Sequence, residues 1–116
     1  MEKKSFDSPD ETRQTPKTKV EVVTIGGATL MRATFEPGWK WSEHVKPTAG
    51  TDSCQVHHVS YGISGRLKVV MDDGTEMEFG PGDVADIPPG HDAWVVGDEP
   101  SVSIDASGGA TYAKPA

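Results

Sequence analysis

The spacing of glycine and proline is the feature that most constrains the fold. The 116 residues include 13 glycines and 9 prolines, which leave only short segments between them. Several of these segments alternate apolar and polar residues, and no apolar repeat of helical period is evident. Alternation with a period of two places successive side chains on opposite faces of a strand. The chain is therefore predicted to be all-β, as a small antiparallel β-barrel or jelly roll.

The turn residues predict how the strands follow one another. Residues 26–27 are Gly-Gly and residues 73–74 are Asp-Gly, and each pair predicts a tight hairpin turn between two strands. Residues 94–96 and 102–104 are predicted to form a last strand pair across the intervening loop. Residues 39–45 are interpreted as extended, which would place two tryptophans on one face and a histidine on the other.

The chain is predicted to be one domain with a separate N-terminal arm. Residues 1–19 are polar, with Phe6 as the only large apolar side chain. They cannot bury enough surface to offset the entropy of ordering, so we expect a mobile arm over 1–19 and a barrel over 20–116. The alternative is an arm that packs on a second subunit through Phe6.

Charge and cysteine content exclude several classes of protein. The net charge of −7 and the pI near 4.9 argue against a nucleic-acid or anionic-membrane partner, because both require clustered Lys and Arg. Cys54 is the only cysteine, which excludes a scaffold held by intrachain disulfides. No segment has the apolar length of a signal peptide or a membrane span. A cytoplasmic location is predicted.

Three histidines lie in three separate segments that are predicted to be strands or strand ends. His44, His58 and His91 can converge on one site, and a neutral imidazole is the commonest protein ligand of zinc, iron and nickel. The alternation over residues 54–61 places Cys54 on the same face as His58, and His57 on the opposite face. Cys54 is either a soft ligand or a buried inert thiol, and each histidine has the alternative role of an ordinary strand residue.

These segments resemble the two signature motifs of the cupin superfamily. The first motif is Gly, five residues, His-x-His, three or four residues, Glu, six residues, Gly; the second is Gly, five residues, Pro-x-Gly, two residues, His. The matching positions are Gly38, His44 and Gly65 in the first motif and Gly82, Pro88 and Gly90 in the second. Lys46 stands at the second histidine, and His58 stands at the glutamate after an apparent insertion over 47–57. Ala93 stands at the last histidine, with His91 two residues earlier.

The resemblance implies a small antiparallel barrel with a divalent metal ion in its mouth. The metal ligands it implies are His44, His58 and His91, and the ion would be Zn, Fe, Mn or Ni. Lys46 is a poor metal ligand because its amine is protonated near neutrality, so it is assigned to an anionic small-molecule ligand. Trp41 and Trp94 are candidates to contact that ligand, with core or dimer packing as their alternative role.

The resemblance does not select a reaction, because the superfamily includes enzymes and non-catalytic sensors. A metal-free binding or sensor module is the alternative function, and a purely structural dimer is a third. A symmetric homodimer is predicted, because apolar residues occur on both faces of several strands, as at Val59, Tyr61 and Ile63 opposite the face of His58.

Overall fold

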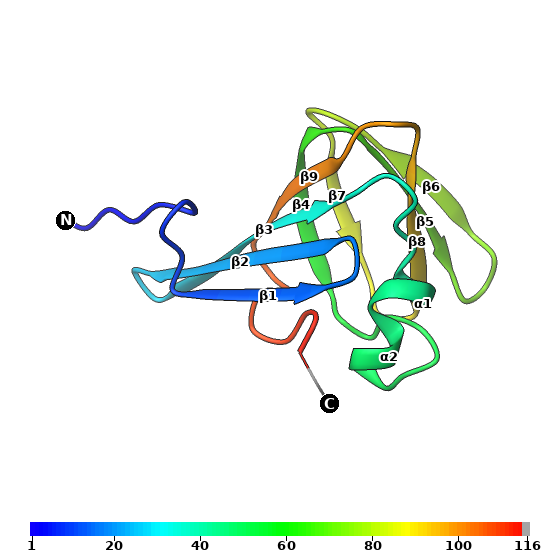
Figure 1. The fold of residues 1–116 in the computed structure, drawn as a ribbon, viewed down its shortest axis with the longest axis horizontal. Helices are drawn as coiled ribbons and strands as arrows, with labels where there is room; N and C mark the ends of the chain where they lie inside the picture. The colour runs from blue at the N-terminus through cyan, green and yellow to red at the C-terminus, as the bar shows by residue number, and fades with distance from the viewer. Residues whose placement is uncertain (115–116) are drawn as a thin grey trace.

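The computed structural model describes residues 1–114, which form two antiparallel sheets with two short helices beside them (Figure 1). The larger sheet has the strand order β1-β2-β3-β9-β4-β7, and the smaller has the order β6-β5-β8. The strands of the two sheets are β1 (Glu11–Thr15), β2 (Thr18–Ile25), β3 (Ala28–Phe35), β4 (His58–Ser64), β5 (Arg66–Met71), β6 (Glu76–Phe79), β7 (Val84–Ile87), β8 (His91–Val96) and β9 (Ser101–Asp105). The predicted all-β fold is confirmed, although neither sheet closes on itself.

Both predicted hairpin turns are present. Ile25 pairs with Ala28 across Gly26 and Gly27, whose φ angles are +58° and +78°. Positive φ at both central residues is what the favoured two-residue hairpin turn needs, and glycine adopts it without a steric cost. The Asp-Gly turn at residues 73–74 likewise joins β5 to β6.

The predicted pairing of residues 94–96 with residues 102–104 is wrong. β8 pairs with β5, whereas β9 pairs with β3 and β4. Residues 97–100 thus carry the chain from one sheet to the other. A loop between two alternating segments does not reveal whether they share a sheet, because that depends on which distant strand each one meets.

Residues 39–45 are not extended as predicted but contain the single-turn helix α1 (Trp41–His44), followed by α2 (Lys46–Ala49). The turn brings Trp41 and Val45, four residues apart, onto one helix face. Both side chains are 1% exposed and join the core between the sheets. Burial of these two large side chains therefore decides the local conformation. Neither described helix is long and apolar enough to cross a membrane.

The predicted arm over residues 1–19 is also corrected, because regular pairing begins at Glu11 rather than at Val20. β1 pairs with β2 along its whole length. Arg13 on β1 is buried and donates a hydrogen bond of 2.7 Å from Nη1 to the carbonyl oxygen of Tyr112. The N-terminal strand therefore holds the C-terminal turn in place. Within residues 1–10, Phe6 is half-buried and lies 5.5 Å from the guanidinium carbon of Arg32.

The outer face of β4 is apolar, as the dimer prediction requires. Val59, Tyr61 and Ile63 are 38 to 47% exposed. Val84 on β7 is 71% exposed and pairs directly with Tyr61. The homodimer stays a prediction, since a single chain contains no interface.

Candidate metal centre

Cys54, His58 and His91 form one buried cluster between the two sheets. One ligand atom from each lies within 4.8 Å of the others, and all three residues are at least nine-tenths buried. Cys54 is fastened to the start of β8 by a β-bridge, in which its amide donates to the carbonyl oxygen of His91 at 2.7 Å. His58 begins β4 opposite Ile87, and its ring centroid is 5.4 Å from that of His91. The cluster therefore joins the segment of Cys54 and His58 to the start of β8, more than thirty residues later in the chain.

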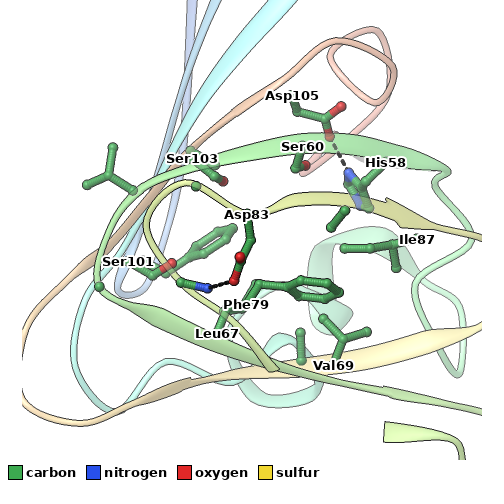
Figure 2. Close-up of a pocket in the computed structure, with 18 of the residues that line it drawn as sticks. His58, Ser60, Leu67, Val69, Phe79, Asp83, Ile87, Ser101, Ser103 and Asp105 are labelled. Atoms are coloured by element: carbon green, nitrogen blue, oxygen red, sulfur yellow. Dashed lines mark hydrogen bonds and ion pairs between the residues drawn. The ribbon is translucent and has the colours of Figure 1, made fainter. Parts of the chain in front are cut away.

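Hydrogen bonds select the tautomer of both imidazoles. His91 Nδ1 lies 2.8 Å from the carbonyl oxygen of Pro88, which can only accept, so Nδ1 carries the proton. His58 Nδ1 is hydrogen-bonded to the carboxylate of Asp105, which accepts in the same way (Figure 2). The lone pairs are consequently on the two Nε2 atoms. His58 Nε2 lies 3.7 Å from Cys54 Sγ.

Asp105 is the charged partner of the cluster and is 1% exposed. Its carboxylate also accepts hydrogen bonds from the amides of Ser107 at 2.8 Å and Gly108 at 3.0 Å. Burial alone would raise the pKa of Asp105, but the hydrogen bond with His58 and these backbone donors outweigh it. The net pKa of Asp105 is lowered, so the group is ionised at neutral pH.

The Cys54 thiol and the His91 imidazole are both uncharged near pH 7. Burial raises the pKa of the Cys54 thiol to about 11, and the charges of Asp105 and Asp92 add to this effect. Burial lowers the pKa of His91, which keeps its imidazole neutral near pH 7. A thiol, two oriented imidazoles and an ionised carboxylate that supports one of them thus make up the cluster.

The predicted site residues are only partly brought together. His58 and His91 lie in the cluster, but His44 does not; it accepts a hydrogen bond of 2.9 Å on Nδ1 from the amide of Lys40, in the turn that forms α1. The role of His44 as a metal ligand stays a prediction; it assumed an extended segment, whereas the structure has α1 there. His57 is exposed, as the alternation predicted.

Of the three residues predicted to contact a ligand, only one lines a described cavity. Trp41 lines the cavity beside the cluster, whereas Lys46 and Trp94 line neither described cavity. Trp94 alternates with the inward residues of β8, so it lies on the outer face, between Lys40 Nζ at 5.3 Å and Lys68 Nζ at 5.9 Å from its ring centroid. Lys46 and Trp94 therefore lie away from both described cavities, and their roles as ligand contacts stay predictions.

The spacing in the sequence could have indicated Cys54 as a candidate ligand. Three residues separate it from His58, which is the spacing between the second histidine and the glutamate of the cupin motif. In that register, no insertion falls over residues 47–57, and α2 with its loop precedes the motif instead. Asp105 and Tyr112 carry no such signal. The ring of Tyr112 is buried edge-on to His58 at 5.0 Å, although it lies far along the chain.

A small cavity lies between the sheets beside His58 and His91 (Figure 2). Its volume is about 60 Å³, which exceeds the roughly 10–15 Å³ that a cavity needs to hold one water molecule. Cys54 instead lines a second cavity, and Trp41 and Tyr112 line both. The cluster therefore sits between the two cavities, where a bound ion could be reached by a small molecule.

Comparison with known proteins identifies the fold. No protein-family model and no curated protein matches the chain in sequence. A solved structure of unknown function from Rhizobium leguminosarum is similar over 100% of this chain and 98% of its own, with 20% identity and a TM-score of 0.66. A Cupin 2 conserved barrel domain protein from Salinispora arenicola is similar over 90% and 86%, with 19% identity and a TM-score of 0.64. The Lactobacillus farciminis oxalate decarboxylase formate complex is similar over 88% and 32%, with 19% identity and a TM-score of 0.60.

Proposed function

We propose that this chain, which has the cupin-type fold of those structures, binds one divalent metal ion through Cys54 Sγ, His58 Nε2 and His91 Nε2. The observation that carries the proposal is that both imidazoles already hold their Nδ1 protons in hydrogen bonds, which leaves their Nε2 lone pairs free, while one ligand atom of each ring lies within 4.8 Å of the Cys54 thiol. Metal-bound histidines characteristically donate from the other ring nitrogen to a carboxylate or carbonyl group. Asp105 and Pro88 supply these two acceptors.

The donor set narrows the choice of metal. One thiolate with two imidazoles suits zinc, iron or nickel, whereas manganese prefers oxygen ligands. Three protein ligands leave a coordination position for water or a small molecule, which is the composition of catalytic rather than structural zinc sites. Lewis-acid chemistry is what such an ion would supply. The reaction itself is not part of the proposal.

A metal-free binding module is the second candidate, and one observation favours it. The Cys54 thiol keeps its proton at neutral pH and can donate it to His58 Nε2, so the cluster satisfies its own hydrogen bonds without an ion. A metal must displace this proton, which costs affinity. The two candidates therefore differ in metal content rather than in fold.

Elemental analysis of protein purified without an affinity tag or chelator separates the two candidates. We expect close to one equivalent of zinc, iron or nickel in the wild-type protein, and at least about tenfold less in Cys54→Ser, since loss of a ligand atom costs affinity directly. His44→Ala is the matched control, because His44 lies outside the cluster. It should keep the wild-type metal content.

Two outcomes would contradict the metal proposal. Wild-type protein without metal, even after incubation with zinc, would support the metal-free module. Loss of metal in His44→Ala with retention in Cys54→Ser would place the ion in the site implied by the family motif. Thermal unfolding of each variant would show that the barrel is intact.

A further inference from the structure

The charge of the cavity restricts what it can hold. Among the described residues that line it, none is Lys or Arg, whereas Asp83 and Asp105 contribute two carboxylates. A buried anion needs an opposite charge or several hydrogen-bond donors to offset its lost hydration. The candidate cation from the sequence, Lys46, lies on α2 and does not line the cavity.

A metal ion in the proposed site would supply less positive charge than one held by three neutral imidazoles, because a metal-bound cysteine is a thiolate. A carboxylate ligand would therefore gain less from this centre.

The two walls of the cavity differ in polarity (Figure 2). One wall, from β4 and β9, presents the hydroxyls of Ser60, Ser101 and Ser103 along the cavity, with Ser60 paired to Asp105 at one end. The opposite wall is apolar and includes Leu67, Val69 and Phe79. No side-chain hydrogen bond engages any of the three hydroxyls within residues 1–114, and Ser101 is 5% exposed. These groups are therefore free to bond to a ligand on one side of the cavity.

The indole of Trp41 provides a second, independent indication of a polar ligand. Trp41 is 1% exposed, lines the cavity, and its Nε1–H has no acceptor among the described residues. A buried donor without a partner costs free energy that an acceptor on a ligand would recover. The ligand-contacting role of Trp41 stays a prediction, in which this Nε1–H would be the donor to the ligand.

We infer that the cavity takes a compact neutral molecule of a few heavy atoms, with hydroxyl or amide groups on one edge and an apolar opposite face, in preference to a carboxylate. The inference rests on the proposed function for the metal-bound state, but the serine wall and the absence of cationic lining residues hold with or without an ion. It replaces the anionic ligand expected from the sequence.

Lactamide and lactate are suitable probes, because they have the same number of heavy atoms and differ in an amide against a carboxylate. Dissociation constants would be measured by NMR titration of the zinc-loaded protein and of the same protein without zinc. We expect lactamide to bind at least about tenfold more tightly in both states, a difference of about 1.4 kcal/mol. Lactate binding as tightly as lactamide, or neither probe binding, would overturn the inference.

Two variants test whether lactamide binds at the serine wall of the cavity. Ser103→Ala should weaken lactamide binding about two- to tenfold, the usual range for one hydrogen bond. Ser107→Ala is the matched control, because Ser107 is exposed and does not line the cavity. An equal loss in both variants would contradict the serine wall. Failure of zinc to bind would refute the metal proposal alone, since lactamide selectivity without zinc is measured separately.

Discussion

His57 and His58 are adjacent in the sequence, and each bonds to an aspartate, but they lie in opposite environments. His57 Nε2 is 2.5 Å from Asp86, and the two side chains are 48% and 73% exposed. His58 bonds through Nδ1 to Asp105, and these side chains are 9% and 1% exposed. The strand alternation alone separates them. The same pair of residue types is therefore a solvated surface contact on one face and the support of a candidate metal centre on the other.

The ring nitrogen that does not bond to the aspartate also lies in a different environment in each of the two histidines. His57 Nδ1 faces the hydroxyl of the exposed Ser107 at 3.2 Å, whereas His58 Nε2 faces the thiol of Cys54. The first contact is exposed to bulk water, whereas the second is buried. Burial strengthens electrostatic interactions and raises the cost of leaving a group unpaired. It is this difference, rather than the residue types, that indicates chemistry at His58.

The largest expected effect is on stability. Asp105→Ala should lower the free energy of unfolding by about 3–5 kcal/mol, because it leaves a buried imidazole and the amides of Ser107 and Gly108 without their acceptor. Asp86→Ala should cost no more than about 1 kcal/mol, as exposed ion pairs do. Urea unfolding measures both. Equal losses in the two variants would show that burial does not distinguish the two histidines.

The next largest effect is expected at the hydrogen bond between Arg13 on β1 and Tyr112 in the C-terminal turn. Arg13→Ala should cost about 1.5–3 kcal/mol, because the charged donor to the carbonyl oxygen of Tyr112 is lost, and the ring of Tyr112 covers His58. Arg66→Ala is the control, since the exposed Arg66 pairs only with Glu78. Its thermal midpoint should match the wild type. An unchanged midpoint in Arg13→Ala would indicate that β1 is dispensable after all.

The metal content of two variants compares His58 with His57 directly. His58→Ala should lower bound metal at least about tenfold while the barrel stays folded, and His57→Ala should leave it unchanged. Elemental analysis of both variants checks this. The reverse pattern would mean that the strand is turned by one residue, which exchanges its two faces.

The smallest effect is a pH dependence. The pKa of Asp105 is lower in the folded protein than its ordinary value of 3.8, so its contribution to stability is present above about pH 4 and is lost as the pH falls through the folded pKa. The difference in unfolding free energy between the wild type and Asp105→Ala should therefore narrow below about pH 4. Urea titrations at several pH values measure it. A constant difference across this range would mean that Asp105 is not ionised in the folded state.

Much of the local structure could be predicted from the sequence. The Gly-Gly turn at 26–27 and the alternation that sends His58 inward and His57 outward depend only on neighbouring residues. Residues 39–45 could not be predicted in this way, since alternation of Trp39, Trp41 and His44 fits a strand as well. The core buries Trp41 and Val45 together, and this tertiary contact overrides the local pattern.

The sequence by itself determined the fold class, the hairpin turns and two of the three candidate ligands, because these follow from side-chain period and turn chemistry over a few residues. Only the tertiary structure decided that Cys54 joins His58 and His91, that Asp105 orients one imidazole, and that His44 lies elsewhere. The reason is that the site is made by strands that meet across the two sheets. Which distant residues converge there depends on how the whole chain packs.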